Sequence, residues 1–471
     1  MLVPPKLVCR ACGRSPDMVV PRFRCTSCGG AQEFEYDYEG LKQVSLKGGL
    51  SFWRYAPYLP QVHERISMGE GGTPIHEARR IGQWLGLSKL FLKDESRNPT
   101  NSFRDRCATL MVSNALDLKF ESVIAATTGN LGASLAAYCA KGNLSCSLLV
   151  PREADMGKLA QMIAYDASVE TQGETIDDNV LAVGIRAEEL GGYEATFETN
   201  ALGIEAVKTI AYEIVEQIGV PDWIVAPMGT GGTIRALWKG VTDLDTLGKI
   251  ETRPRLIGVQ AAGCSPIVQA FASQSLDVPE AIEARTSALA IRVRRPVYGS
   301  LALESLRESN GLAVSVSDEE IARTEHHLAH MEGMFAEPAS SAALACLAGL
   351  REHGVIGTND TIVCVITSSG LKTTDIVTAL RRRVKSPGTG NFLATKERIL
   401  RLVQDSGTYG YQIWKSMGKD VTLGAVYQHL SELERKDFIE AWKKGNRRYL
   451  TLTKKGQDIL ATLDELRNLL S

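Results

Sequence analysis

Short apolar runs alternate with amphipathic helical patterns through most of the chain, from about residue 69 to residue 383. Six of the apolar runs predict strands, at residues 89–92, 122–126, 145–150, 223–227, 256–260 and 361–367. Helical periodicity fills the segments between them, for example residues 103–116 and 132–141. Strands that alternate with helices form mostly parallel sheets covered by helices, so we expect an α/β fold.

A different pattern begins after the Ser-Pro-Gly-Thr-Gly-Asn segment at residues 386–391, whose composition is typical of a linker. Residues 396–404 predict one helix, a second begins near residue 409, and a third covers residues 423–436. Two strand-like runs then flank a basic Gly-Asn turn at residues 443–448, and residues 454–470 predict a last helix. This order predicts a small helical module that carries a β-hairpin.

Composition is that of an ordinary globular protein, with 471 residues, 44% apolar, 23% charged and a formal net charge of −2. The basic charge is concentrated at the C-terminal end, because residues 391–471 carry 14 Lys+Arg against 10 Asp+Glu. No apolar run reaches the ~20 residues of a membrane helix, and the N-terminus has no signal-peptide core. We therefore expect a cytoplasmic protein with no membrane partner and a local basic module.

Four of the ten cysteines form two Cys-x2-Cys pairs, and we expect them to bind structural zinc: Cys9, Cys12, Cys25 and Cys28. Paired thiolates in turns at this spacing close a tetrahedral Zn²⁺ site, as in a zinc ribbon. The alternative is two redox or disulfide pairs, which a reducing compartment disfavours. The other six cysteines lie in apolar or helical contexts, where buried thiols are expected.

Glycine-rich turns follow two of the predicted strands. The loop at residues 229–233 (Gly-Thr-Gly-Gly-Thr) comes directly after one strand and can open a helix. Such a loop turns backbone N–H groups toward a phosphate, with help from the helix dipole. The alternative is a plain strand-to-helix turn. Residues 127–132 have the same shape.

Several segments together resemble the threonine synthase family, whose members are fold-type II pyridoxal-phosphate (PLP) enzymes. Their order and spacing over much of the chain carry the resemblance, and some members also have N-terminal cysteine pairs. The segments are residues 69–74 (Gly-Glu-Gly-Gly-Thr-Pro), 93–95 (Lys-Asp-Glu), 98–106 (Asn-Pro-Thr-Asn-Ser-Phe-Arg-Asp-Arg), 127–134 (Thr-Thr-Gly-Asn-Leu-Gly-Ala-Ser), 227–233 (Pro-Met-Gly-Thr-Gly-Gly-Thr), 337–340 (Glu-Pro-Ala-Ser) and 367–372 (Thr-Ser-Ser-Gly-Leu-Lys).

The resemblance implies parallel sheets of the fold-type II class and a set of ligand-binding positions. Asn130 would meet the hydroxyl of the cofactor ring, and Thr367 would meet its pyridine nitrogen. Substrate or ligand would contact Ser102, Thr127, Thr128 and the residue at position 104. The phosphate would lie against the loop of Gly229, Thr230, Gly231, Gly232 and Thr233.

The main departure from the family is Arg104, which stands where the family has the lysine that holds PLP as a Schiff base. Arginine stays protonated at neutral pH and cannot form that bond. Two neighbouring family glycines are also replaced, by Asn101 and Cys107. Lys93 is a conceivable substitute, but the family has a lysine there as well. Arg104 could instead clamp a phosphate or carboxylate, or simply form a salt bridge with Asp105.

The C-terminal module resembles the PadR-like winged helix-turn-helix family. The carriers are residues 409–411 (Tyr-Gly-Tyr), 424–427 (Gly-Ala-Val-Tyr), Leu430-x2-Leu433-Glu434 and 447–453 (Arg-Arg-Tyr-Leu-Thr-Leu-Thr). The resemblance implies that Thr422, Gln428 and His429 read the major groove of DNA. Wing residues would contact phosphates, unless the hairpin is merely solvated: Lys443, Lys444, Arg447 and Arg448.

Winged helices of this kind pair through their last helix, so we expect a homodimer. The candidate pairing residues, which could instead pack within the module, are Leu460, Leu463, Leu466 and Leu470. We expect four parts: a zinc ribbon (1–45), a threonine-synthase-like domain (46–385), a linker (386–394) and a winged helix (395–471).

The leading hypothesis is a transcription regulator that lacks the Schiff-base lysine and senses PLP without a covalent bond, an amino acid or a phosphorylated metabolite. The runner-up is a working PLP-dependent lyase of the threonine synthase type, converting O-phosphohomoserine to threonine, with a DNA-binding domain attached. A third hypothesis keeps the fold only as a dimerisation scaffold.

Overall fold

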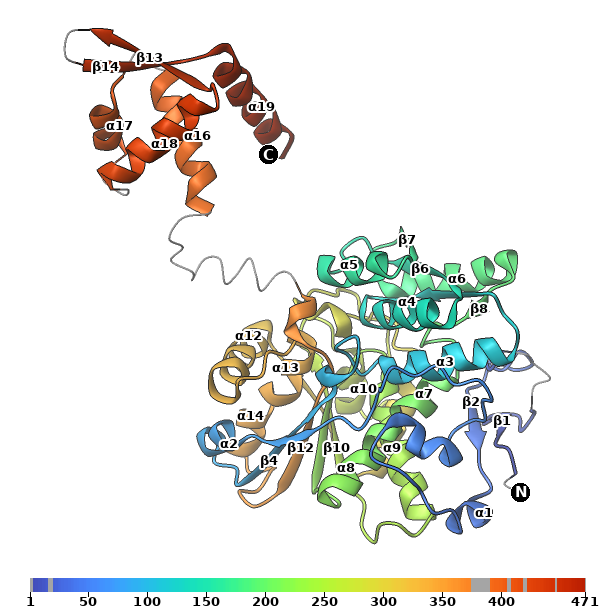
Figure 1. Ribbon diagram of the computed structural model, residues 1–471. Coiled ribbons are helices and arrows are strands. Elements are labelled where there is room, and N and C mark those ends of the chain that lie inside the picture. The colour runs from blue at the N-terminus through green and yellow to red at the C-terminus, as the bar shows by residue number, and fades with distance from the viewer. Residues whose placement is uncertain are drawn as a thin grey trace. The chain divides into compact units, whose positions relative to one another are not determined.

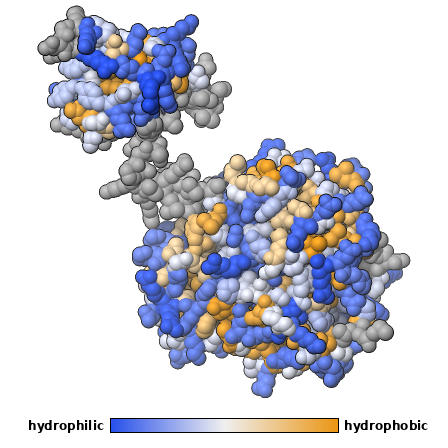
Figure 2. All heavy atoms as spheres, viewed as in Figure 1, coloured by the Kyte–Doolittle hydropathy of each residue, from blue (hydrophilic) through white to orange (hydrophobic). Residues whose placement is uncertain are grey.

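A computed structural model describes residues 3–15, 20–373, 390–404, 408–417, 422–444 and 447–470. The chain divides into two compact units, Met1–Ile376 and Val377–Ser471. Within the described residues, no helix combines the length and apolar character needed to cross a membrane. The visible face of each unit is mostly hydrophilic, with apolar side chains scattered among the polar ones (Figure 2).

The first unit is built on two parallel sheets. The larger sheet has the strand order β11-β10-β9-β12-β4-β3, and only β3 runs antiparallel. The smaller sheet has the order β7-β6-β5-β8 and is wholly parallel. The strands are β3 (Ile75–Glu77), β4 (Lys89–Asp94), β5 (Ser122–Ala126), β6 (Ser145–Val150), β7 (Ser168–Thr171), β8 (Tyr193–Glu194), β9 (Trp223–Pro227), β10 (Arg255–Ala261), β11 (Leu312–Val316) and β12 (Thr361–Ile366).

These strands confirm the six predicted from the apolar runs, and three of them have the predicted bounds: β5, β6 and β9. The central strands are buried on both faces, which is why each reads as a continuous apolar run. Strands β3, β7, β8 and β11 were not predicted. The first three are short runs with polar side chains, and a serine interrupts the apolar run of β11, which lies at the sheet edge.

Helices cover both sheets (Figure 1). Those most relevant to the site are α3 (Asp105–Asp117), α4 (Asn130–Gly142), α5 (Met156–Ala164), α7 (Leu202–Val207), α8 (Thr209–Ile218), α9 (Gly232–Thr246) and α13 (Pro338–Ala345). The others of this unit are α1 (Tyr38–Lys42), α2 (Arg79–Leu85), α6 (Ile176–Leu190), α10 (Pro266–Ala272), α11 (Gly299–Glu308), α12 (Asp318–His327) and α14 (Leu347–Glu352).

The N-terminal segment packs into the first unit. Its strands β1 (Lys6–Cys9) and β2 (Gln32–Glu35) form an antiparallel pair. Phe23 and Phe34 of this segment belong to the same hydrophobic core as α3, α4 and α9. Arg235 of α9 binds the Glu33 carboxylate through two nitrogens, at 2.7 and 2.6 Å.

The second unit has the element order predicted for a winged helix. Helices α16 (Gly390–Gln404), α17 (Gly410–Ser416) and α18 (Leu423–Arg435) precede an antiparallel hairpin of β13 (Ile439–Lys444) and β14 (Arg447–Leu452). Helix α19 (Lys454–Leu470) ends the unit. Because α16 begins at Gly390, part of the expected linker is helical, and residues 386–389 lie outside the described residues.

Candidate ligand pocket and DNA-binding surface

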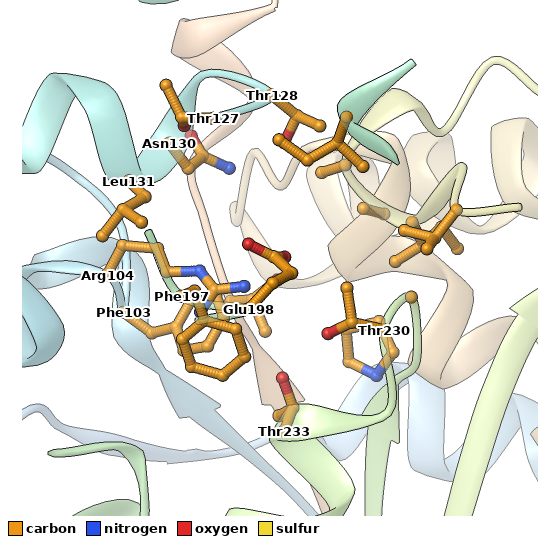
Figure 3. Close-up of a pocket in the computed structure, with 18 of the residues that line it drawn as sticks. Phe103, Arg104, Thr127, Thr128, Asn130, Leu131, Phe197, Glu198, Thr230 and Thr233 are labelled. Carbon is orange, nitrogen blue, oxygen red and sulfur yellow. The ribbon is translucent and has the colours of Figure 1, made fainter. Parts of the chain in front are cut away.

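A pocket lies at the carboxyl ends of β5, β9 and β12, where ligands bind in open parallel sheets. Thr127 and Thr128 follow β5, Gly229, Thr230 and Thr233 follow β9, and Thr367 follows β12. Asn130 at the start of α4 and Arg104 before α3 complete the predicted part of the lining (Figure 3). Ser102, Gly231 and Gly232 lie in the same loops but do not line the pocket in the described structure.

Arg104 projects its guanidinium into this pocket (Figure 3). Its central carbon lies 3.9 Å from the ring centroid of Phe197 and 4.5 Å from that of Phe103, the geometry of cation–π contacts. The expected salt bridge with Asp105 does not form in the described structure, since both Asp105 oxygens accept hydrogen bonds from Thr100. The Nη1 atom of Arg104 is buried and has no hydrogen-bond partner among the described residues.

The glycine loop offers backbone donors to the same pocket. Gly231 has φ +88°, a left-handed conformation that glycine adopts without strain, and it is the N-cap residue of α9. A Cβ there would meet the Tyr298 carbonyl oxygen at 2.9 Å. Among the described hydrogen bonds, the N–H groups of Gly229, Thr230 and Thr233 have no acceptor, and that of Gly232 has only Thr230 Oγ1 at 3.4 Å. Unpaired N–H groups at a helix N-terminus form a site for an anion.

Asn130 begins a buried polar chain that runs from the pocket wall inward, and both Asn130 and Glu337 line the pocket. Its Nδ2 donates to both carboxylate oxygens of Glu337 at 3.0 Å. The Glu337 carboxylate also lies 3.3 Å from the ammonium of Lys158, which donates to Asp155 at 2.7 Å. Burial alone would lower the pKa of Lys158, but the two carboxylates raise it above its ordinary value. Lys158 is therefore a fixed cation, and it does not line the pocket.

Thr367 is also held by a neighbour. Its Oγ1 shares a 2.8 Å hydrogen bond with Oγ of Ser340 on α13, and its carbonyl oxygen accepts from the N–H of Phe103 at 2.9 Å. These bonds fix the strand end beside the Arg104 loop. The adjacent Ser102 is fully buried, and its Oγ accepts from the N–H of Arg104 at 3.3 Å.

Lys93 lies outside the pocket, in a buried ion network, and this corrects its candidacy as a substitute for the family lysine. Its ammonium donates to Glu213 at 2.6 Å, to the Thr73 carbonyl at 2.7 Å and to Gln217 at 2.9 Å. Arg106 bridges the same Glu213 to Glu95, with every charged side chain of the network fully buried. Among the described residues that line the pocket there is no lysine.

Sequence reasoning missed Phe197, whose ring packs against the guanidinium of Arg104, and the adjacent Glu198; both line the pocket (Figure 3). Burial raises the pKa of Glu198, an effect that the nearby Arg104 charge partly offsets. Phe197 and Glu198 follow β8, which is only two residues long and is not marked by an apolar run in the sequence. The general rule that ligands meet the carboxyl ends of parallel strands would have found them once β8 was known.

The four cysteines converge as expected for zinc. Their sulfur atoms all lie within 4.8 Å of one another, with Cys9–Cys28 at 3.4 Å and Cys12–Cys25 at 3.9 Å. A tetrahedral Zn²⁺ site with bonds of ~2.3 Å needs sulfurs ~3.8 Å apart, so the donor set fits. All four ligand positions are filled by protein, as in a structural site.

The pocket fits only part of PLP. The unpaired loop donors and Arg104 suit a phosphate, and Thr367 and Asn130 bring a hydroxyl and an amide to the lining. No amine lines the pocket in the described residues to form the covalent bond.

In the second unit, Gln428 and Tyr427 of α18 are exposed, and Thr422 caps this helix by accepting from the N–H of Ala425 at 3.3 Å. His429 is only 9% exposed, so its expected contact with DNA is corrected. Arg448 is paired with Glu434 at 2.5 and 2.6 Å, and Lys443 is exposed. The side chains of Lys444 and Arg447 lie outside the described residues.

Leu460 packs in the core of the second unit at 2% exposure, which corrects its place on a pairing face. The reason is that α19 turns this position toward α16 and the hairpin. The side chains of Leu463, Leu466 and Leu470 lie outside the described residues.

Comparison with known proteins agrees with both resemblances. Residues 66–368 match the family described as pyridoxal-phosphate dependent enzyme, and residues 399–462 match the transcriptional regulator PadR-like family. The threonine synthase of Methanocaldococcus jannaschii is 40% identical over 377 residues, covering 78% of this chain and 93% of that protein. The threonine synthase of Methanosarcina acetivorans is 38% identical, covering 78% of this chain and 92% of that protein.

Solved structures share the fold of the first unit. Maize serine racemase superposes with a TM-score of 0.57 at 19% identity, covering 66% of this chain and 92% of that chain. The processed form of threonine deaminase isoform 2 from Solanum lycopersicum gives a TM-score of 0.56 at 20% identity, covering 66% of this chain and 82% of that chain.

The parallel sheets and the glycine-loop pocket define a protein of the fold-type II PLP class. Within that class, the chain belongs to the pyridoxal-phosphate dependent enzyme family and is a homologue of the threonine synthases, with a PadR-like domain at its C-terminal end.

Proposed function

We propose that this protein is a DNA-binding transcription regulator whose threonine-synthase-like domain binds a small anionic ligand and does not catalyse a reaction. One observation carries the proposal. Arg104 replaces the family's Schiff-base lysine, and its Nη1 atom is buried without a partner among the described residues, beside a loop with unpaired N–H groups. A buried guanidinium nitrogen without a hydrogen bond is costly, and an anionic ligand would offset that cost.

The proposed ligands share a phosphate or a carboxylate. They are PLP held without a covalent bond, O-phosphohomoserine, threonine or a related amino acid. The guanidinium of Arg104 would form paired hydrogen bonds with the anion, and the loop of Gly229, Thr230 and Thr233 would add backbone donors. Thr127 and Thr128 lie on the opposite wall, where they could accept from or donate to the rest of the ligand (Figure 3).

The proposed DNA-binding surface consists of α18 and the β13–β14 wing. Gln428 is exposed for base contact and Lys443 for phosphate contact. The net charge of residues 391–471 is +4, which favours an acidic partner. We propose a homodimer, because two copies would reach two half-sites, and a cytoplasmic location, where DNA and reduced cysteines are both expected.

Regulation requires that the ligand bind two arrangements of the protein unequally. The test begins with DNA fragments selected from a random pool by the purified full chain. Operator affinity is then measured by fluorescence anisotropy with and without O-phospho-L-homoserine, threonine, PLP or inorganic phosphate. We expect at least one of these anions to change the affinity by about fivefold or more.

Two variants make this test specific. Arg104→Gln should abolish the anion effect, because it removes the charge that holds the ligand, whereas Arg295→Gln should keep it. Arg295 is a suitable control because it is an exposed arginine paired with Glu280. Lys443→Ala should lower the slope of log affinity against log salt by about 1, and Lys249→Ala, at an exposed position in the first unit, should not. Failure of every fragment to bind, or of every anion to act, would refute the regulator.

A second candidate function is a PLP-dependent threonine synthase-type lyase with a DNA-binding domain attached. The 40% identity to a threonine synthase over 78% of the chain favours it. It requires an amine that reaches bound PLP. Borohydride reduction of the protein with PLP, followed by peptide mass spectrometry, decides the matter. A pyridoxyl adduct on one lysine would support the enzyme.

A further inference from the structure

We propose that the four-cysteine site positions the wall of the ligand pocket, so that metal binding at the cysteines sets the affinity of the pocket for its anion. The wall in question is the loop 195–201, which carries Phe197 and Glu198. The proposal rests on the proposed function, because it concerns how the same pocket is regulated. It adds a functional role to a site whose expected role is stabilisation alone.

The backbone of the cysteine segment pairs directly with this loop. The N–H of Phe23 donates to the Thr199 carbonyl at 2.7 Å, and the N–H of Ala201 donates to the Pro21 carbonyl at 2.9 Å. Arg22 and Asn200 form an isolated antiparallel bridge between these two bonds. Phe23 is two residues before the ligand Cys25, so the fold of the metal loop fixes where loop 195–201 lies.

Aromatic side chains continue the connection to the ligand-binding arginine. The rings of Phe23 and Tyr298 lie 4.3 Å apart, and those of Tyr298 and Phe197 lie 5.5 Å apart. Phe197 in turn lies 3.9 Å beneath the guanidinium of Arg104. Tyr298 also donates its hydroxyl to the Phe197 carbonyl at 2.7 Å. All three aromatic side chains are buried, so movement of one must displace the next.

The other wall of the pocket is linked to the same tyrosine. The N–H of Tyr298 donates to the carbonyl of Thr230 in the glycine loop at 3.0 Å. Arg235, on the first turn of the helix that follows this loop, binds Glu33 of β2. Tyr298 and Phe23 are therefore positioning residues for both anion-binding elements, and neither lines the pocket itself.

The metal decides whether Phe23 stays in place. The four sulfur atoms lie within 4.8 Å of one another, and a metal ion that binds all four would tie the two Cys-x2-Cys turns together. The segment has only two strands of four residues each, so we expect the metal to contribute much of its local stability. Loss of zinc should therefore release the Phe23–Tyr298–Phe197 contacts and loosen the pocket wall.

The experiment measures anion binding to the full chain in its zinc-loaded form and after removal of zinc by a chelator. Isothermal titration calorimetry with inorganic phosphate and with PLP gives the dissociation constants, and atomic absorption gives the zinc content. We expect the metal-free protein to bind about tenfold more weakly. By linkage, saturating anion should raise the zinc affinity by the same factor, and Arg104→Gln should remove that effect. A merely structural zinc site would show no such reciprocity.

Two variants test the path without removing the metal. Phe23→Leu should raise the dissociation constant about fivefold at full zinc content. The matched control, Phe34→Leu, changes another buried aromatic residue of the same segment and should have no effect. Tyr298→Phe, remote from the cysteines, removes only the bond to the Phe197 carbonyl and should raise the constant about threefold.

The outcomes separate the two proposals. If the zinc-loaded protein binds neither probe, the proposed sensor function fails. If both metal states bind alike and Tyr298→Phe binds like wild type, the sensor stands and the positioning role of the cysteine site is overturned. If Phe23→Leu loses zinc, the connection through Phe23, Tyr298 and Phe197 is tested by the dissociation constant of Tyr298→Phe alone.

Discussion

At the scale of single residues, Arg104 is the side chain that bears most on the chemistry of the pocket. Arg104 lies directly before α3, at the position that the resemblance assigns to the family lysine. Asn101 has φ 63°, in the left-handed region that glycine adopts without strain. Asparagine tolerates that conformation better than most residues, so this position does not require a glycine.

Restoring the lysine should restore covalent binding of the cofactor. In Arg104→Lys, a primary amine reaches the same pocket, and the loop donors remain for the phosphate. We expect a visible absorption band on addition of PLP and, after borohydride, a pyridoxyl adduct at position 104. Wild type should give no adduct at any lysine. An adduct in wild type would contradict the claim that Arg104 prevents covalent chemistry.

The buried network around Glu213 should make stability depend on acid. Burial would raise the pKa of Glu213, but Arg106 and Lys93 lower it to about 2, below the ~4.3 of an unfolded chain. A lowered carboxyl pKa adds stability that is fully present above the unfolded pKa and is lost as the pH falls toward the folded pKa. We therefore expect the free energy of unfolding to decrease from about pH 4.5 downward.

Substitution isolates this contribution. Glu213→Gln should lower the free energy of unfolding by about 3–5 kcal/mol at neutral pH, because it leaves two buried cations, Lys93 and Arg106, with the Glu95 carboxylate alone to balance them. It should also flatten the acid slope in chemical denaturation. Glu216→Gln on the same helix breaks only a partly exposed pair with Arg54, so it should cost about 1 kcal/mol or less. Equal effects of the two variants would contradict this view of the network.

At the scale of elements, the periodic pattern predicted the helix α19 correctly but did not show which of its side chains pack inside the unit. Leu460 is buried against the core of the second unit, whereas its neighbour Ile459 is 37% exposed. Leu460→Ala should destabilise this unit by about 2–5 kcal/mol, and Ile459→Ala by much less.

Hydrogen exchange followed by mass spectrometry tests this prediction in the full chain, because it measures the protection of the backbone amides of each element. In Leu460→Ala, the amides of α16, α18 and the β13–β14 hairpin should lose protection together, while those of the first unit keep theirs. If Leu460 instead lay on an intermolecular face, its substitution would change the sedimentation of the protein and leave exchange in α16 unaltered.

At the scale of the whole molecule, the proposed regulation joins two compact units through one binding equilibrium. Thermodynamic linkage requires that a ligand which changes operator affinity by some factor has its own affinity changed by the operator to the same extent. Calorimetry of the anion with and without the selected operator should therefore reproduce the factor found by anisotropy. Unequal factors would mean that the anion acts on DNA binding outside the pocket, and the Arg104→Gln variant would then still respond.

The strand and helix pattern of the first unit followed from the sequence because buried parallel strands are continuous apolar runs, as in β5, β6 and β9. Short or polar strands such as β3 and β8 carry no such signal, and they were missed. The glycine loop was predicted as a phosphate site from its residues, and the threonine synthase resemblance placed it in one pocket with Arg104. Phe197 and Glu198 were missed because only the position of β8 in the sheet brings them there.

The sequence by itself determined the chemistry that is possible: an arginine in place of the reactive lysine, four thiols for a metal, and a basic module at the C-terminal end. These are properties of residue type and spacing, which folding does not change. Tertiary structure alone decided which groups are free to act. It buried Lys93 and His429, left Arg104 Nη1 without a partner among the described residues, and joined the cysteine segment to the pocket through Phe23 and Tyr298. Such outcomes depend on contacts between residues far apart in the chain, which no local pattern encodes.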